Sequence, residues 1–361
     1  MVKKLKTLRE TQVSTGSGFF TYSAWPSICK DEKGVLYVVC SGNRINHMCP
    51  FGRIILYKSR DNGKTWSAPV TIKDSFLDDR DPSIIYLGNG RMLMMCCNHP
   101  AEVYEKDFAN WIREDSGNLG TEMLKRFAEL DKKDRLGGAF VKISQDFGET
   151  WSDDYPIPVH CPHGPVILEN VNIFIVGKEM YSYGAEEKGV LAAYESTDRG
   201  ETFQKVGTLI RPNEYGRDKF HEPHCVELDD GRIMALIRSH ILENDQYFTI
   251  YKSISSDGGK SWSVAEPTGI CGSPPHLLKL KSGKIVLTYA RRAEPYGIYG
   301  RMIENNGKIS DEEFLIDSAL DDDIGYPASV ELDNGDIITV YYMKKQTDNK
   351  CRIYAKTWQL D

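Results

Sequence analysis

Short apolar runs alternate with polar turns along the chain, and six of the runs begin at a proline. One run covers residues 225–228; a turn at Gly231 and a second apolar run at residues 233–236 follow it. This order of run, glycine turn and run is the pattern of a β-hairpin. In five of the six cases a glycine follows the proline by eight residues. The prolines are Pro26, Pro82, Pro165, Pro223, Pro275 and Pro327, and the glycines are Gly34, Gly90, Gly231, Gly283 and Gly335.

The spacing of these prolines predicts a ring of stacked sheets. Successive prolines lie 56, 83, 58, 52 and 52 residues apart. Units of this size cannot bury a sheet face alone and must stack on their neighbours. We therefore expect a single domain spanning residues 1–361, although the length alone would suggest two or three domains. Residues 1–20 carry a weak strand signal outside any complete unit, and we expect them to pair with the last unit and close the ring.

A second repeat has the pattern Ser-x-Asp-x-Gly-x-Thr/Ser-aromatic. The Asp carboxylate can accept backbone N–H groups within a turn, the Gly permits a positive φ, and the aromatic side chain anchors the hairpin. Residues 305–307 carry an incomplete version of this pattern. The four complete copies are residues 59–66, 144–151, 196–203 and 255–262.

These octets resemble the Asp-box (BNR) repeats of the sialidase (neuraminidase) superfamily, and the chain resembles bacterial exo-α-sialidases. The resemblance implies an all-β fold, a six-bladed β-propeller with four-stranded antiparallel blades, in which each box closes the hairpin between the third and fourth strands. It covers nearly the whole chain, because octets and prolines both recur once per blade. In that superfamily the boxes lie far from the active site and also occur in non-enzymes, so they indicate the fold more than the chemistry.

The long interval between Pro82 and Pro165 predicts a helical insertion in blade two, at about residues 100–138. Met123, Phe127 and Leu130 have helical spacing, and Thr121 suits an N-cap. We expect one or two helices. They suit a packing or dimer element, which leaves a homo-oligomer open, or a lid over the site, because the insertion follows His99.

Composition and charge limit the classes of partner and the cellular compartment that we expect. The net charge is −7, the pI is near 5.7, and no dense Lys/Arg tract occurs. Nucleic acid and anionic membranes are therefore poor partners, and a small or uncharged substrate, or an anion held by a local arginine cluster, fits better. No secretory leader or transmembrane run is present, and most of the nine cysteines lie in apolar runs, so we expect a soluble cytoplasmic protein.

Propeller geometry predicts where the candidate catalytic residues lie. The inner strands begin around the central channel, so the residues just before each proline should converge there. The second strand of each blade ends on the same side, which adds His99, Arg238 and residues 291–292. The converging residues before the prolines are Trp25, Asp81, Gly164, Glu222, Pro274 and Tyr326.

The resemblance assigns Tyr326 as a nucleophile that Glu222 activates. Residues 324–327 resemble the tyrosine-bearing segment of retaining sialidases, and residues 221–223 followed by Arg238 resemble the segment with the glutamate and one arginine. A neutral phenol suits a substrate that carries a carboxylate beside the reacting carbon, because it avoids repulsion between like charges. The alternative is a structural role, in which both residues only cap the starts of strands.

The resemblance also implies three arginines that hold the carboxylate of the sugar. Arg238 fits the second of them, and Arg291 or Arg292 fits the third better than Arg301 does. The family has Arg-Ile-Pro at the first blade, whereas this chain has Trp25 before Pro26. Arg44 or Arg80 would have to replace the first arginine in space. We also count Trp25 among the substrate-binding residues.

The general acid departs from the family as well. Sialidases place an aspartate in the blade-one loop, but residues 41–50 contain none. Asp81 is the acidic residue at a central position, and we assign it the acid role, with a strand-capping role as the alternative.

Histidines open a second hypothesis. Six of them fall near the mouth, and His47, His221 and His276 are candidates for contact with the substrate. A propeller-fold polysaccharide lyase, or another glycosidase acting on uronic-acid-containing glycans, would use a His or Tyr base beside an arginine or a metal. No His-x-x-x-His or Cys-x-x-Cys pair occurs, so we predict no metal and no cofactor. The six are His47, His99, His163, His221, His240 and His276.

The favoured interpretation is a glycoside hydrolase that releases a terminal acidic sugar with retention of configuration, in the manner of an exo-α-sialidase. A small acidic sugar or glycan is then the partner. A third possibility is a non-catalytic Asp-box carbohydrate-binding protein, for which no cluster of ionisable groups is expected at the mouth.

Overall fold

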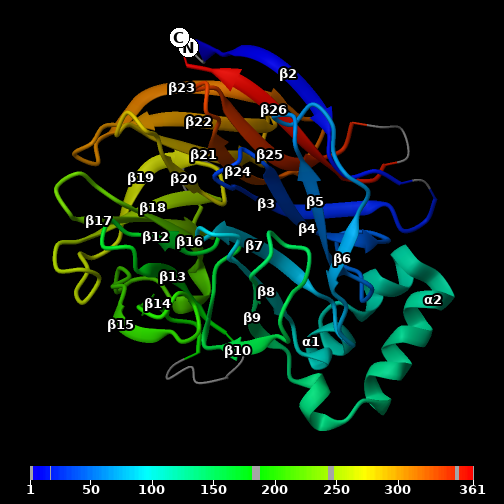
Figure 1. Cartoon of the computed structure of the whole chain (residues 1–361). Coiled ribbons are helices and arrows are strands. Elements are labelled where there is room, and N and C mark those ends of the chain that lie inside the picture. The colour runs from blue at the N-terminus through cyan, green and yellow to red at the C-terminus, as the bar shows by residue number, and fades with distance from the viewer. Residues whose placement is uncertain (1–2, 17, 181–187, 243–247, 346–348, 361) are drawn as a thin grey trace.

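Six antiparallel sheets stand around a common axis and form a β-propeller (Figure 1). The computed structural model describes residues 3–16, 18–180, 188–242, 248–345 and 349–360. The predicted six-bladed, all-β architecture is confirmed. Blade three departs slightly from four simple strands, because its inner edge consists of two short strands that both pair with the same neighbour.

The first three blades follow one another along the chain. Blade one contains β3 (Tyr22–Lys30), β4 (Leu36–Arg44), β5 (Arg53–Ser59) and β6 (Val70–Lys73). Blade two contains β7 (Arg80–Tyr86), β8 (Met92–Asn98), β9 (Gly138–Ser144) and β10 (Tyr155–Ile157). Blade three contains β11 (Val159–His160), β12 (Val166–Ile167), β13 (Ile173–Glu179), β14 (Leu191–Ser196) and β15 (Gln204–Thr208).

The last three blades continue in the same direction around the axis. Blade four contains β16 (Phe220–Glu227), β17 (Ile233–Ser239), β18 (Thr249–Ser255) and β19 (Glu266–Cys271). Blade five contains β20 (His276–Lys279), β21 (Ile285–Arg291), β22 (Gly297–Ile303), β23 (Ile309–Ser318) and the added β1 (Lys3–Lys4). Blade six contains β24 (Gly325–Glu331), β25 (Ile337–Met343), β26 (Arg352–Gln359) and β2 (Lys6–Gln12).

The N-terminal segment closes the ring, as the sequence predicts. Strand β2 pairs antiparallel with β26, from Lys6 opposite Gln359 to Gln12 opposite Tyr354. Strands β2 and β26, from opposite ends of the chain, therefore lie side by side (Figure 1). The short strand β1, which precedes β2 in the chain, pairs in parallel with β23 of blade five. Together the two strands cover sheet edges that would otherwise be open to pairing with other chains.

The core lies between neighbouring blades. Leu36 and Val38 of blade one pack with Ile338 and Val340 of blade six in one buried cluster. Similar clusters join blades three and four, and blades four and five. Both faces of a blade are therefore buried, which explains why the central strands read as nearly continuous apolar runs and not as alternating ones.

Each octet closes the turn between the third and fourth strands of its blade. In the second copy, Asp146 Oδ1 accepts the Thr150 N–H at 2.9 Å and Oδ2 accepts the Thr150 hydroxyl at 2.6 Å. These hydrogen bonds lower the pKa of Asp146 to about 2. Gly148 has φ +72° and donates its N–H to Ser144 Oγ. The hydroxyl of the seventh residue thus has a role that the sequence analysis did not assign. At residues 305–307 only the turn and a glycine with φ +86° remain.

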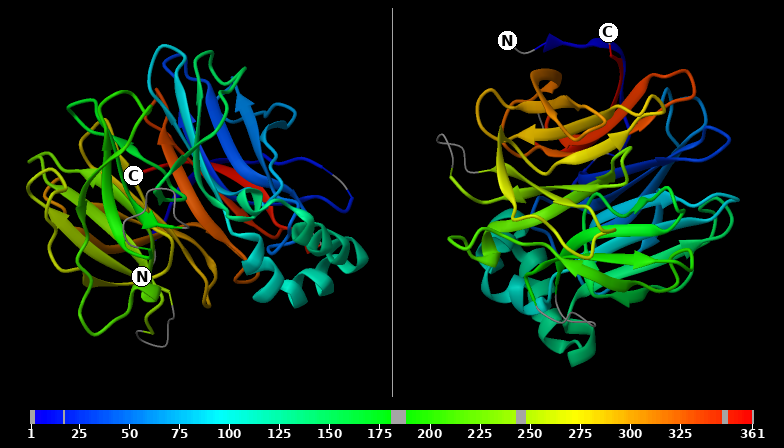
Figure 2. Two further views of the ribbon diagram at one scale, coloured as in Figure 1. Left: turned by 90° about the horizontal axis from the view of Figure 1, so that it is seen from below. Right: turned by 90° about the vertical axis from the view of Figure 1, so that its left-hand side faces the viewer.

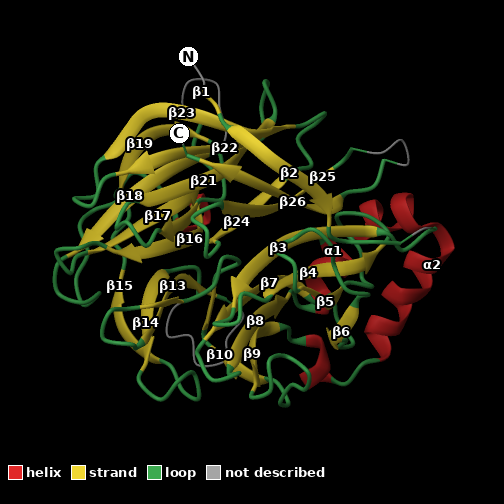
Figure 3. Cartoon of the chain, turned by 45° about the horizontal axis from the view of Figure 1, so that its top comes forward, coloured by secondary structure: helices red, strands yellow, loops and turns green. Residues whose placement is uncertain are grey.

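The predicted insertion is helical and lies outside the ring, beside blades one and two (Figures 2 and 3). It contains α1 (Ala101–Lys106), α2 (Ala109–Glu129) and the 3₁₀ turn η1 (Lys132–Arg135) between β8 and β9. Thr121 is not an N-cap: it lies within α2, and its hydroxyl donates to the Gly117 carbonyl at 3.2 Å. The helical segment starts at Ala109 and is broken at Gly117, whose φ of 56° and ψ of −135° are not helical. The helix after this break begins before Thr121, so the N-cap prediction was wrong.

Two further observations concern the described residues. None of their helices is long and apolar enough to cross a membrane. No two of the nine cysteines form a disulfide, and eight of the nine are buried. Buried thiols of this kind pack as small apolar side chains.

The ring closure gives a first prediction. Deleting residues 1–15 is expected to lower the Tm by roughly 5 °C or more, because blade six loses β2 and the edge of β26 becomes exposed. Thermal unfolding followed by circular dichroism measures this shift. The matched control is deletion of residues 1–4, which removes only β1 and should change the Tm by less than about 2 °C. Equal melting of the wild type and the longer deletion would contradict a closing role for β2.

Candidate active site

A cavity of about 770 Å³ opens at the centre of the propeller and receives side chains from all six blades. Its volume lies in the range of sites for small molecules, roughly 300–1,000 Å³. Tyr326, Glu222 and Asp81 line it together, as the sequence predicts for residues that precede the prolines. The cavity is also lined by Trp25, His47, Arg80, His221, Arg238 and Arg292.

The residues before the inner-strand prolines have an unusual backbone conformation. Trp25, Asp81, Glu222 and Tyr326 have φ of 54°, 48°, 43° and 50°. Each lies at a β-bulge, where the pairing with the next strand shifts its register. Left-handed backbone at a non-glycine residue costs of order 1–3 kcal/mol and concentrates at functional sites. A bulge turns a side chain away from its normal direction, so here four strands direct one side chain each into the cavity.

Tyr326, Glu222 and Arg238 form a connected triad. The Tyr326 hydroxyl donates to Glu222 Oε1 at 2.7 Å, and Arg238 Nη1 donates to Glu222 Oε2 at 2.6 Å. Arg238 Nη1 also lies 3.2 Å from the phenolic oxygen. The guanidinium therefore contacts both the carboxylate and the phenol, and it is placed to stabilise negative charge on either.

The environment separates the charge states of the phenol and the carboxylate. Burial, and then the charge of Glu222, raise the pKa of Tyr326 well above its usual range. Burial also opposes ionisation of Glu222, but the charge of Arg238 and the hydrogen bond from Tyr326 outweigh it and lower the pKa of Glu222 to about 2. At neutral pH the pair is thus a neutral phenol hydrogen-bonded to an ionised acceptor.

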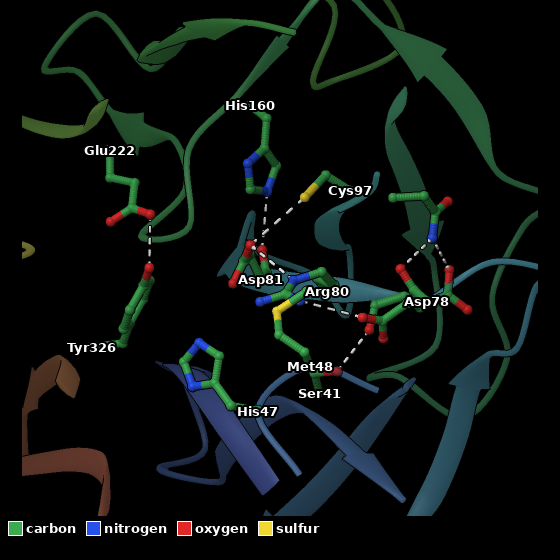
Figure 4. A network of polar contacts seen from close by, with 12 residues as sticks. Ser41, His47, Met48, Asp78, Arg80, Asp81, Cys97, His160, Glu222 and Tyr326 are labelled. Carbon is green, nitrogen blue, oxygen red and sulfur yellow. Dashed lines mark hydrogen bonds and ion pairs between the residues drawn. The ribbon is translucent and has the colours of Figure 1, made fainter. Parts of the chain in front are cut away.

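Asp81 lies apart from this triad and has a different environment. Figure 4 shows the Glu222–Tyr326 pair on one side and Asp81 with Arg80 on the other. Burial raises the pKa of Asp81, with a smaller contribution from Glu222 and opposition from Arg80. Its Oδ1 atom is buried and has no hydrogen-bond partner among the described residues. A buried carboxyl group with a raised pKa can hold a proton and donate it.

Three guanidinium groups line the cavity: those of Arg80, Arg238 and Arg292. Arg80 extends from blade two and stacks on the Trp25 ring, 4.1 Å from the ring centre. It thereby supplies a guanidinium near the position where the sequence lacks the first family arginine. In each of the three, the Nε atom is buried without a hydrogen-bond partner in the described part of the chain. These are donors that a bound anion could use.

Two arginines proposed for the site lie elsewhere. Arg291, the last residue of β21, pairs with Glu313 at 2.6 Å and stacks on Tyr299, whereas Arg292, just after the strand, lines the cavity. Arg44 is fully buried, pairs with Asp78 and lies 4.7 Å from the Trp25 ring. Neither side chain lines the cavity, and Arg301, the third option, is also directed toward Glu313.

The candidate histidines divide into two groups. His47 and His221 line the cavity, but their Nδ1 atoms already contact Asp323 and Lys178, each at 3.0 Å. His276 does not line it. That ring packs with His224 and His163 at ring-centre distances of 4.8 and 5.3 Å, and burial lowers the pKa values of all three.

Three further histidines line the cavity. His99 and His240 were expected there, and His160 was not among the candidates from the sequence. No group of three or more His, Cys, Asp or Glu residues in the described segments has the arrangement of a metal site.

Two features of the site escaped sequence reasoning. Asp78 is fully buried and binds Arg44 and Arg80, and it accepts the hydroxyl of Tyr104 at 2.7 Å. Its signal was the run of acidic residues just before strand β7. Phe108 and Trp111 of the insertion also line the cavity. Two aromatic residues three positions apart in an inserted segment were the available signal.

Comparison with known proteins agrees with this architecture. The profile of the BNR repeat-like domain matches residues 138–339, and that of the BNR/Asp-box repeat matches residues 57–68. A sialidase of Bacteroides fragilis (strain YCH46) is 23% identical over 241 residues, which are 59% of this chain and 41% of that protein. The chain thus spans less than half the length of this relative.

Solved structures show the same fold at low identity. A protein of unknown function from Dyadobacter fermentans DSM 18053 superposes with a TM-score of 0.77 at 20% identity, covering 100% of both chains. The NanB sialidase from Streptococcus pneumoniae gives a TM-score of 0.71 at 16% identity, covering 97% of this chain and 70% of that one. With the family profile matching more than half of its length, the chain belongs to the BNR repeat-like family and is a sialidase-like propeller.

Proposed function

We propose that the protein is a retaining exo-glycosidase that releases a terminal acidic sugar, with Tyr326 as nucleophile, Glu222 as its base and Asp81 as general acid. The observation that carries the proposal is the 2.7 Å hydrogen bond from the Tyr326 hydroxyl to Glu222, with the protonatable Asp81 in the same cavity. The names of the relatives, a sialidase of Bacteroides fragilis and the NanB sialidase, are consistent with it.

The arginines of the cavity favour an acidic substrate. The protein as a whole carries a net charge of −7, whereas the cavity combines three guanidinium groups and the ammonium of Lys178 with the carboxyl groups of Asp81, Glu179 and Glu222. Guanidinium groups bind carboxylates through two parallel charge-assisted hydrogen bonds. We assign Arg80, Arg238 and Arg292 to the sugar carboxylate. A neutral phenol as nucleophile avoids repulsion from that carboxylate.

The first half of the reaction forms a covalent intermediate. The Tyr326 oxygen attacks the anomeric carbon as its proton passes to Glu222, and Arg238 stabilises the charge that develops on the phenolic oxygen. The bond from the anomeric carbon to the leaving oxygen breaks, and Asp81 protonates that oxygen.

The second half consumes water. Asp81, now ionised, accepts a proton from the water that attacks the anomeric carbon. The bond to Tyr326 breaks, and the phenol recovers its proton from Glu222. Two displacements at one carbon give net retention of configuration.

Two alternatives remain as outcomes of the tests. In a lyase, the same phenol would remove a proton beside a uronate carboxylate, and the product would contain a conjugated double bond that absorbs in the near ultraviolet. A non-catalytic binding protein has no need of a nucleophile, a base and an acid in one cavity.

Tyr326→Phe tests the nucleophile. It removes only the phenolic oxygen, so turnover of an acidic glycoside should fall by at least about 10²-fold while the Tm stays close to that of the wild type. Glu222→Gln should cause a comparable loss, because the phenol loses its proton acceptor. The matched control, Tyr299→Phe, removes a phenolic oxygen that lies outside the cavity and should leave turnover unchanged. Near wild-type turnover in Tyr326→Phe would exclude the tyrosine mechanism, and an unsaturated product would favour the lyase.

Asp81→Asn tests the general acid through the leaving group. With an alkyl leaving group turnover should fall by about 10²–10⁴-fold, whereas a nitrophenyl group departs without protonation and should lose far less. For the wild type, turnover of the alkyl substrate should decrease as the pH rises through the raised pKa of Asp81, because only the protonated form donates. The variant should lack this decrease. An equal loss with both leaving groups would rule out the acid role.

Arg292→Lys tests the carboxylate site, and its neighbour provides the control. Lysine keeps the positive charge but loses the planar pair of donors, so KM for the acidic substrate should rise by about tenfold or more. Arg291→Lys changes the same side chain one position earlier, where it faces Glu313, and should leave KM within about twofold. Steady-state kinetics with both variants decides the assignment. Similar KM values for the two variants would contradict it.

A further inference from the structure

A hydrogen-bonded group on the blade-one side of the cavity has no role in the proposed mechanism. It consists of His47 in the loop after β4, Tyr22 of β3 and Asp323 in the segment before β24. His47 Nδ1 lies 3.0 Å from Asp323 Oδ1 and 3.1 Å from the Tyr22 hydroxyl. That hydroxyl donates to both oxygens of Asp323, at 3.0 and 3.1 Å. Tyr22 is fully buried, whereas the His47 side chain is 35% exposed and lines the cavity.

These contacts decide which ring nitrogen of His47 carries the proton. Burial opposes ionisation of Asp323, but the hydrogen bond and charge of His47 and the charge of Lys344 outweigh it and lower the pKa of Asp323 below its usual range. An ionised carboxylate only accepts hydrogen bonds, so Nδ1 must be the protonated nitrogen. The ring is open to the cavity but shielded from bulk solvent, and this burial lowers the pKa of His47, although the hydrogen bond and charge of Asp323 oppose it. At neutral pH the imidazole is therefore uncharged and has its lone pair on Nε2.

The Nε2 atom of His47 is the part of this group that faces the cavity. In the described segments the imidazole makes its hydrogen bonds through Nδ1 alone. The Trp25 ring packs against it edge to face, with ring centres 5.1 Å apart. Figure 4 shows the imidazole turned toward the space between Tyr326 and Asp81. A histidine that a carboxylate holds at one nitrogen, with the other nitrogen free in a site, is arranged to act as an acceptor.

We propose that His47 is a further catalytic residue, whose Nε2 accepts a hydrogen bond from the water that attacks the anomeric carbon, and that Asp323 positions it. The inference rests on the proposed function, because it concerns the second half of that reaction. The bond to Tyr326 breaks as the bond to the water oxygen forms, and one hydrogen of the water passes to Asp81 as a proton. The other hydrogen bonds to His47 and remains on the oxygen, as part of the new anomeric hydroxyl group. His47 itself neither gains nor loses a proton.

His47 lies on the same side of the cavity as the acid. The sulfur of the next residue, Met48, lies 3.5 Å from Arg80 Nη1, and Arg80 in turn lies 3.8 Å from Asp81 Oδ2. The water must attack the face of the sugar that the leaving group has left, which is opposite the bond to Tyr326. Asp81 acts on that face, and His47 from the neighbouring blade adds a second acceptor there. Two acceptors in fixed positions orient the water, with a lone pair directed at the carbon.

An uncharged acceptor suits this position better than the other acceptors of the wall. Glu222 already accepts hydrogen bonds from Tyr326 and Arg238, and Glu179 accepts the Tyr194 hydroxyl at 2.8 Å. A water bound to either carboxylate would have to compete with these donors. The neutral imidazole also does not repel the carboxylate of the sugar, as a further carboxylate would.

Methanol separates this role from a merely structural one. Methanol has one O–H hydrogen, which goes to Asp81, so its attack on the covalent intermediate cannot use His47. In His47→Asn the amide nitrogen takes the place of Nδ1 beside Asp323, but nothing occupies the position of Nε2. Hydrolysis should therefore slow by about fivefold to tenfold relative to methanolysis, the scale of one lost hydrogen bond. The ratio of methyl glycoside to free sugar at a fixed methanol concentration should rise by the same factor, with the nitrophenyl glycosides of a sialic acid and of glucuronic acid as probes.

Three further variants make the result specific. His47→Gln places an amide oxygen near the position of Nε2 and should return the product ratio to within about twofold of the wild type. Asp323→Asn can donate to Nδ1 and so move the proton to Nε2, which should raise the ratio in the same direction as His47→Asn. His99→Asn changes another histidine of the same cavity and should leave the ratio within about twofold.

Nitrogen NMR of isotope-labelled histidine gives a readout that does not depend on activity. The imidazole signals that disappear in His47→Asn should report a protonated Nδ1 and an unprotonated Nε2 at neutral pH. The role of His47 is overturned if His47→Asn has the product ratio of the wild type, if His99→Asn raises the ratio equally, or if the proton is on Nε2. A wild type that forms neither product from either probe would instead refute the proposed function, and the role of His47 with it.

Discussion

The left-handed backbone before the inner-strand prolines is the constraint on which the site depends. Trp25, Asp81, Glu222 and Tyr326 all hold a φ near 50°, which ordinary side chains avoid. Such a conformation persists only where the surrounding structure fixes it. Here each strand is packed between two other blades, and the ring is closed by β2 on β26, so no blade can relax its bulge alone. The closed ring therefore also fixes the orientation of the candidate catalytic groups.

The position of Arg80 at the cavity depends on Asp78. This fully buried carboxylate contacts two guanidinium groups, those of Arg44 and Arg80. Arg80 also lies 3.8 Å from Asp81 Oδ2, so its guanidinium contacts a second carboxyl group at the cavity. Arg44 is enclosed, whereas Arg80 reaches the cavity. The guanidinium that is missing at the first blade is in this way supplied by the neighbouring blade, where Asp78 holds it in place.

Much of this arrangement could be predicted from the sequence, because the repeat sets the register. Aligning the chain on its prolines identifies Tyr326, Glu222 and Asp81 as neighbours in space without any knowledge of their contacts. The choice between Arg291 and Arg292 could not be made in this way, since it depends on the direction that each side chain takes at the end of β21. Thr121 was assigned as an N-cap from local preference, but the helix after the break at Gly117 already includes Thr121, and Leu124 and Phe127 of that helix pack in the insertion's apolar cluster. Asp78 and Tyr104 meet only through tertiary folding, and no local pattern records that.

The pairing of β2 with β26 also has a consequence for how the protein is made. Lys6 lies opposite Gln359, so β2 leaves the ribosome long before its partner strand β26 is synthesised. Throughout synthesis β2 remains a single strand with free N–H and C=O groups, while the early blades can already stack on one another. Contacts of such long sequence separation form slowly. Four of the seven residues of β2 are Lys, Arg, Glu or Gln, and such a polar strand is poorly suited to pairing with other nascent chains during that wait.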